Sequence, residues 1–157
     1  MLRVLLALLL LAPLASAAGG ELIIGQASVI DGDTIEIHGE RIRLFGVDAP
    51  ESRQLCGRVD GTPYRCGQIA ALALADRIGR AAVTCEPRGR DRWRRIIAVC
   101  SANGEDMGRW MARSGHALAF LKYSETYLPD ERAAQDARSG VWQGQFVEPW
   151  KWRKGAR

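Results

Sequence analysis

The feature that most constrains the fold is a set of short segments built from β-branched and alternating residues. Residues 34–38 and 41–47 alternate apolar with polar side chains, and residues 22–30 are rich in Val and Ile. A period of two is typical of strands that bury one face. Residues 81–86 and 95–100 return to the same residue types later in the chain. We therefore expect five strands, the first three forming a meander.

The hydrophobic period changes to that of a helix after Cys66 and again near the C-terminus. One helix should end at Gly79, and further helices are predicted over 105–113 and over 130–138, the last with Asp130 as its N-cap. The predicted inner stripe of the first helix is Ile69, Leu72, Ala73 and Ile78. Five strands with a helix after the third predict an α+β fold that is mainly β, a five-stranded OB-fold barrel with three helices.

The first 17 residues have the pattern of a secretory signal peptide. Arg3 supplies a positive charge, residues 4–12 form an apolar run, and Ala15-Ser16-Ala17 offers a cleavage site. The run is shorter than the roughly 20 residues that a membrane-spanning helix needs. We expect residues 1–17 to be removed, leaving a periplasmic or secreted protein with no stable membrane association.

Four cysteines in an exported chain favour two disulfides over free thiols or metal ligands. Three pairings are possible. We favour Cys56–Cys66, which closes a loop rich in Gly and Pro, and Cys85–Cys100, which would face each other across a hairpin. Neither spacing is typical of a zinc site.

The balance of charge permits a polyanionic partner without requiring one. The 157 residues carry 22 Lys and Arg against 18 Asp and Glu, a formal charge of +4, and 47% of them are hydrophobic. This composition fits one folded domain and excludes a disordered chain.

Three carboxylates and two arginines stand where predicted strands meet turns. Asp33, Asp48 and Glu51 offer the hard oxygens that Ca²⁺ prefers. Ordinary turn chemistry would explain each acid taken alone. However, Arg43 and Arg95 lie on the strands beside these turns, and a guanidinium binds phosphate through two parallel hydrogen bonds. The combination predicts a site for a phosphate group and a cation.

Four sequence motifs together resemble the staphylococcal-nuclease-like, or thermonuclease, family. They are Asp31-Gly-Asp-Thr34, the stretch Ile42-Arg-Leu-Phe-Gly-Val-Asp-Ala-Pro-Glu51, Asp91-Arg-Trp-Arg-Arg95 and Gly140-Val141-Trp142. The resemblance runs from about Ala27 to Trp142, and we assign residues 22–152 to one such domain. It implies an OB-fold barrel with three helices that hydrolyses DNA and RNA with Ca²⁺ and leaves 3′-phosphate ends.

The resemblance also implies a role for nine residues. The calcium ligands would be Asp33, Asp48 and the main-chain carbonyl of Ala49. The catalytic side chains would be Arg43, Glu51 and Arg95, with Glu51 orienting or deprotonating the attacking water. The substrate-binding side chains would be Arg92, Trp93 and Tyr123. The chain departs from the family at Ala49, where Thr is usual, and at Arg94, where Gly is common.

Two other functions fit parts of the pattern. A noncatalytic OB-fold module that binds nucleic acid would need the arginines but not the carboxylates, which repel phosphate unless a cation lies between them. An exported Ca²⁺-binding structural protein would leave the arginine-rich segment 88–94 unexplained. We therefore expect a monomeric endonuclease that prefers single-stranded or denatured DNA and RNA.

Overall fold

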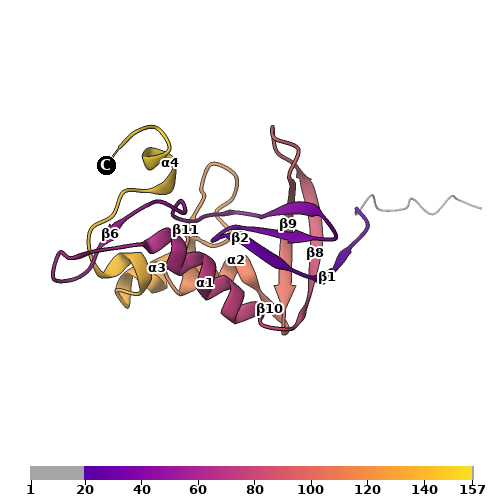
Figure 1. Ribbon diagram of the computed structural model, residues 1–157, viewed down its shortest axis with the longest axis horizontal. Coiled ribbons are helices and arrows are strands. Elements are labelled where there is room, and N and C mark those ends of the chain that lie inside the picture. Colours follow the sequence, from indigo (N-terminus) through magenta and orange to yellow (C-terminus); the bar gives the residue numbers. More distant parts are fainter. Residues whose placement is uncertain (1–19, 157) are drawn as a thin grey trace, which may run out of the picture.

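A curved sheet forms the frame of the molecule (Figure 1). Its neighbouring strands are antiparallel except for one parallel pair. The computed structural model describes residues 20–156. The main sheet contains β1 (Ile23–Gln26), β2 (Ser28–Asp31), β3 (Thr34–Ile37), β4 (Glu40–Leu44), β8 (Ala82–Arg90), β9 (Ile96–Ala102) and β10 (Glu105–Asp106). Their order is β1-β8-β9-β4-β3-β2, with β10 paired to β9. The α+β prediction of an OB-like barrel is confirmed, although the first predicted strand is two strands that meet at Ala27.

The alternating residues of β3 and β4 form the centre of the core. Ile35, Ile37 and Ile42 are fully buried, and Leu44 is nearly so. Each apolar side chain enters the barrel while its neighbours face outward, as a period of two requires. The strand β4 pairs in parallel with β9, which places Arg43 opposite Ile97. This pairing brings the third predicted strand beside the fifth and closes the curved sheet.

Helix α1 (Cys66–Ile78) ends at Gly79 as predicted, but it buries a different face. Its inner residues are Gly67, Ala70, Leu74 and Ile78, together with Cys66. The predicted stripe is wrong at Ile69 and Leu72, which are 38% and 63% exposed. The helix lies so close to the segment before it that a Cβ on Gly67 would stand 1.8 Å from the Glu51 carbonyl oxygen. Small residues therefore take the inner face at this end of α1.

The two later helices begin at residues other than those predicted. Helix α2 (Met107–Arg113) starts after β10, and Asp106 caps it by accepting a hydrogen bond from the Arg109 amide. Helix α3 (Leu128–Asp136) has Tyr127 at its N-cap, so the prediction of Asp130 as the cap is wrong. Asp130 is 4% exposed and pairs instead with Arg109 and Arg113 of α2.

Short elements complete the chain. They are β5 (Val47–Asp48) paired with β11 (Leu118–Ala119), β6 (Cys56–Gly57) paired with β7 (Pro63–Tyr64), the 3₁₀ helix η1 (Gly140–Gln143) and helix α4 (Pro149–Trp152). Sequence patterns did not predict η1 or α4. The tail that ends in α4, the loop after β11 and the tip of the β8–β9 hairpin all project from the upper side of the molecule in Figure 1.

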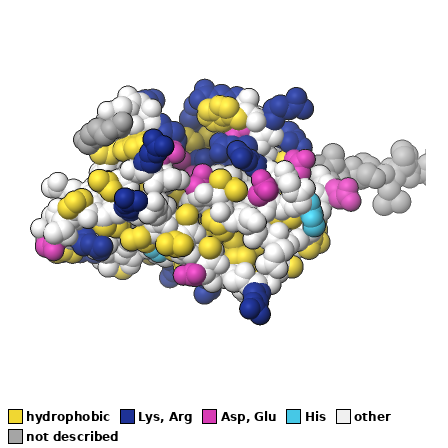
Figure 2. Space-filling view, in the orientation of Figure 1, with side chains coloured by type: hydrophobic (Ala, Val, Ile, Leu, Met, Phe, Trp, Pro, Cys, Tyr) yellow, Lys and Arg dark blue, Asp and Glu magenta, His cyan; other side chains and the backbone are white. Residues whose placement is uncertain are grey.

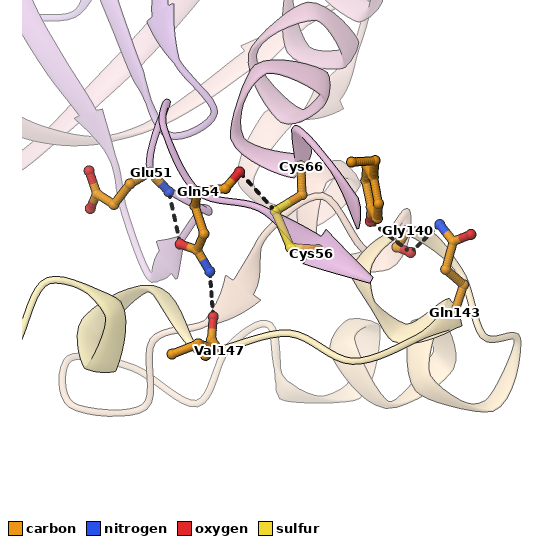
Figure 3. The surroundings of a disulfide bond; sticks show 8 residues. Glu51, Gln54, Cys56, Cys66, Gly140, Gln143 and Val147 are labelled. Carbon is orange, nitrogen blue, oxygen red and sulfur yellow. Dashed lines mark hydrogen bonds between the residues drawn. A yellow bond between two sulfur atoms is a disulfide. The ribbon is translucent and has the colours of Figure 1, made fainter. Parts of the chain in front are cut away.

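The predicted disulfides are confirmed. Cys56 joins Cys66 at the start of α1, and Cys85 joins Cys100 across the β8–β9 pair. Figure 3 shows the first bond beside Gln54, whose side chain reaches Val147 of the C-terminal segment. The predicted signal peptide lies outside the described residues. Within residues 20–156, no helix has the length and hydrophobicity needed to cross a membrane.

Candidate functional site

A wide groove of about 1600 Å³ lies on the side of the barrel where the loop after β11, the hairpin tip and α4 meet. Eight of the nine predicted site residues line it: Asp33, Arg43, Ala49, Glu51, Arg92, Trp93, Arg95 and Tyr123. The ninth, Asp48, is fully buried directly behind Arg43, to which it is bonded. Lys and Arg side chains gather along the upper part of the molecule, with Asp and Glu between them (Figure 2). The structure therefore brings the predicted residues together from separate parts of the chain.

Arg43 lies at the centre of the site and joins the two buried aspartates. Its Nη1 donates to Asp33 Oδ1 at 2.9 Å, and its Nη2 donates to Asp48 Oδ1 at 2.7 Å. Burial lowers the pKa of Arg43, but the charges of Asp33 and Asp48 outweigh burial and raise it above its ordinary value. The guanidinium stays charged, is held in one orientation by the two aspartates, and lines the groove.

Asp33 is fixed by groups on both of its oxygens. Oδ1 accepts from Arg43 and from the Thr34 hydroxyl at 3.0 Å, and Oδ2 accepts from the Ala49 amide at 2.9 Å. Burial raises the pKa of Asp33, and the charge of Arg43 and these hydrogen bonds oppose that rise in part. The ionised carboxylate therefore gains from a cation beside it. The Ala49 amide supplies its hydrogen bond whether the side chain is Ala or Thr.

Arg95, which directly precedes β9, also lines the groove and contacts Thr34. Its Nε donates to Asp91 Oδ2 at 2.7 Å, and its Nη1 lies 3.5 Å from Thr34 Oγ1, next to Asp33. Asp91 also accepts from the amides of Trp93 and Arg95. Although burial raises the pKa of Asp91, the hydrogen bonds and charge of Arg95 lower it overall. Asp91 therefore remains charged and orients Arg95, a role that the sequence motif did not reveal.

Arg94 adopts the left-handed backbone conformation that the family's usual Gly would favour. Its φ is 69°, a region that a residue with a Cβ enters only at some cost in energy. The turn is closed by the Arg94 amide, which donates to the Asp91 carbonyl, and by Arg90, which donates to the Arg94 carbonyl. The Gly-to-Arg departure therefore preserves the turn that presents Arg95.

Two exposed aromatic side chains from different loops line the groove. Trp93 is 62% exposed, with the guanidiniums of Arg92 and Arg95 at 4.0 and 5.3 Å from its ring centre. Tyr123 is 61% exposed and contacts Phe120 edge to face at 5.1 Å. Large exposed rings next to cations suit the flat faces of unpaired bases and the phosphates between them.

The C-terminal segment contributes residues that sequence reasoning missed. Arg153 donates to Asp48 and Glu51, while Trp150 stacks on Phe120 with ring centres 5.7 Å apart. The sequence gave no signal for Arg153, because its partners lie about a hundred residues earlier. Gln54, fully buried, holds the Glu51 amide and the Val147 carbonyl (Figure 3).

The donor set fits a divalent cation in an open site. Asp33 and Asp48 are buried carboxylates whose negative charges are balanced by the guanidiniums of Arg43 and Arg153. The surroundings of these two carboxylates therefore already accommodate positive charge. Within residues 20–156, no cluster of three or more His, Cys, Asp or Glu side chains could hold a metal. A cation here would need main-chain oxygen and water to complete its shell, as Ca²⁺ accepts.

Fold and site together define a staphylococcal nuclease domain. The family model described as staphylococcal nuclease homologue matches residues 41–144, and the chain belongs to that family. The confirmed family is one of nucleases, which act on nucleic acids.

Three curated relatives are similar to the chain, and the name of one of them is that of an endonuclease. The chain is similar to succinoglycan biosynthesis protein ExoI of Rhizobium meliloti, at 44% identity over 82% of this chain and 69% of the relative. It is 32% identical to protein ParB of Escherichia coli over 98% of this chain and 91% of the relative. It is also 32% identical to an uncharacterized endonuclease of Escherichia coli over 80% of each chain.

Proposed function

We propose that this protein is an exported, Ca²⁺-dependent endonuclease that hydrolyses DNA and RNA without regard to the sugar and leaves 3′-phosphate ends. One observation carries the proposal. Arg43 of β4 bonds buried Asp33, and Arg95, which directly precedes β9, contacts the adjacent Thr34 in the same groove. A protein that only bound nucleic acid would gain from the arginines, but buried carboxylates would repel the phosphates unless a cation joined them.

In this proposal the cation is held by Asp33, Asp48 and the main-chain carbonyl of Ala49. A bound divalent cation would draw negative charge from the phosphoryl oxygens and make water easier to deprotonate. Two carboxylates and one main-chain carbonyl would leave part of the coordination shell to water and substrate. Ca²⁺ suits such a site because it accepts flexible, mixed oxygen ligands.

The side chains divide the remaining work between proton transfer and charge stabilisation. Glu51 lines the groove next to Asp48 and would accept the proton of the attacking water. Arg43 and Arg95 would each bind nonbridging oxygens as charge develops on the phosphate, and the 5′ oxygen would leave. Because Arg43 and Arg95 are already oriented by Asp33 and Asp91, little reorganisation opposes this step.

The exposed rings support a preference for single-stranded or denatured substrate. Trp93 and Tyr123 can stack on bases only if those bases are not paired within a duplex, and stacking is tolerant of sequence. Two disulfides are typical of proteins that fold in an oxidising compartment, which supports an exported location.

The test is cleavage of a labelled single-stranded oligonucleotide by the mature protein, with DNA and RNA in parallel. We expect EDTA to abolish cleavage and Ca²⁺ to restore it. Arg95→Ala should lower kcat by about two orders of magnitude or more, as loss of a charge-stabilising donor does. The matched control is Arg80→Ala, which removes the same charge from an exposed position outside the groove.

Three results would contradict the proposal. Oligonucleotide binding without cleavage in saturating Ca²⁺ would identify a binding module. Equal rates for the Arg95 and Arg80 variants would remove Arg95 from the site. Products with 5′-phosphate ends would reverse the proposed leaving group.

A further inference from the structure

Arg153, in the C-terminal segment, contacts the proposed metal ligand Asp48 and the neighbouring Glu51 with its positively charged guanidinium. Arg153 Nη2 donates to Asp48 Oδ2 at 2.7 Å, and its Nη1 donates to Asp48 Oδ1 at 3.0 Å. The same Nη1 donates to Glu51 Oε1 at 2.7 Å. One guanidinium therefore engages both oxygens of the buried aspartate and the carboxylate proposed to activate water. This bidentate geometry is among the stronger kinds of ion pair.

The position of Arg153 follows from two anchors earlier in the C-terminal segment. Gln54 donates to the Val147 carbonyl beside the Cys56–Cys66 bond (Figure 3). The Gly57 amide donates to the Gln145 carbonyl at 2.7 Å. Beyond these anchors, the Trp150 ring stacks on Phe120. These anchors fix the position at which α4 begins. The ordered segment that follows them therefore places Arg153 beside Asp48 and Glu51.

A divalent cation and the Arg153 guanidinium cannot both occupy Asp48. The two Asp48 oxygens face Arg153, and Arg43 takes a second position on Oδ1. A cation bound to these oxygens would lie within a few ångströms of the guanidinium carbon, where like charges repel strongly in a partly buried site. Binding of one therefore requires that the other move away.

We propose that the segment 148–156 is an internal competitor for the metal cation, in which Arg153 neutralises Asp48 and Glu51 until the cation displaces it. The inference rests on the proposed function for the identity of the metal ligands. Side-chain exposure of 37% for Arg153 against 0% for Asp48 is consistent with a guanidinium that can withdraw toward solvent while the aspartate stays in place.

The exchange also changes the charge that the groove offers to a substrate. Asp33, Asp48 and Glu51 with Arg43 and Arg153 carry one net negative charge. A divalent cation in place of Arg153 removes that negative charge and releases a guanidinium at the edge of the groove. Phosphate binding then becomes more favourable, so cation and nucleic acid should each increase the affinity for the other.

Calcium affinity measured by titration calorimetry without nucleic acid tests the competition directly. Arg153→Gln removes the charge and shortens the side chain while it keeps a polar end, and we expect it to bind Ca²⁺ about tenfold more tightly than the parent protein. The matched control is Lys154→Gln, which removes a neighbouring charge that also lines the groove. It should change the affinity by less than about twofold, because it measures only the general effect of one positive charge.

A second measurement reports release of the segment. Endoproteinase Lys-C cleaves after Lys151, so we expect Ca²⁺ to speed cleavage there in the parent protein, and Arg153→Gln to be cleaved quickly with or without Ca²⁺. Circular dichroism at the assay temperature verifies that each variant is folded.

The outcomes separate the competition from the proposed function. Equal Ca²⁺ affinities for the parent and Arg153→Gln, or weaker binding by the variant, would overturn the competition while leaving the metal site intact. Equal gains in the Arg153 and Lys154 variants would also overturn it, since the effect would then be general. No Ca²⁺ binding by any of the three proteins would refute the proposed metal site itself.

Discussion

Replacing Gly67 with alanine tests how closely the fold holds Glu51. The added Cβ at position 67 would lie 1.8 Å from the Glu51 carbonyl oxygen, whereas ordinary contact begins at 3.4 Å. The two segments would have to separate by about 1.6 Å, because both contacting groups are backbone and neither can rotate away.

Two effects of Gly67→Ala on stability have opposite signs. Alanine favours a helix by up to about 1 kcal/mol over glycine, and by less in the first turn, where this residue lies. Overpacking costs typically about 1–3 kcal/mol. The second effect should win, with a net loss of about 1–2 kcal/mol and a fall in Tm of about 3–6 °C. Displacing Glu51 by about 1 Å should lower kcat about 100-fold.

The assay combines thermal unfolding with oligonucleotide cleavage well below the transition. Gln68→Ala is the matched control, because Gln68 is the next residue of α1 and is exposed. It should leave both Tm and kcat close to their original values. A Gly67→Ala protein with unchanged or higher Tm and full activity would refute the close contact between α1 and the Glu51 backbone. A lower Tm with full activity would refute the role given to Glu51.

Three further predictions follow from contacts of single groups. Asp91→Asn keeps an acceptor for the Trp93 and Arg95 amides but loses the charge that orients Arg95. We expect kcat to fall about tenfold with little change in KM. Changes of equal size in kcat and KM would contradict a role of Asp91 in orienting Arg95. Removing the buried Cys85–Cys100 bond with paired alanine substitutions should lower the free energy of unfolding by about 3 kcal/mol in urea titration, and an unchanged midpoint would contradict this. Burial lowers the pKa of His116, so its neutral ring stabilises the fold above its ordinary pKa of 6.5, and this stability is lost as the pH falls through the lower pKa of the folded state. His116→Gln should therefore lose less stability than the parent between pH 7.5 and 5, and parallel pH profiles would exclude His116 as the cause.

Local sequence patterns were sufficient to predict the strands in which alternating residues decide which side chains are buried. The alternation in β3 and β4 predicted which side chains enter the barrel, and the symmetry of Cys85 and Cys100 about a turn predicted their bond. Two features depended on other parts of the chain. The inner face of α1 is set by close contact with the Glu51 backbone, which favours small residues over Ile69 and Leu72. Asp130 fails to cap α3 because two arginines of α2 engage its carboxylate.

The candidate site was likewise predicted from the sequence only in part. Motifs located the acids and arginines, and the structure brings them to one groove. The motifs could not show that Arg43 joins both aspartates or that Asp91 orients Arg95, since these contacts require the folded turn. Arg153 was beyond any local pattern because nothing beside it in the sequence indicates its partners.

The long separation between Asp48 and Arg153 has a consequence for the order of folding. Their contact spans 105 residues, and the anchoring bond from Gln54 to Val147 spans 93. Contacts that close such long loops pay a large entropic cost and tend to form late. The adjacent strands β3 and β4 can therefore pair while Asp48 still lacks its C-terminal partner. At that stage both oxygens of the Asp48 carboxylate lack the Arg153 guanidinium that holds them in the finished fold.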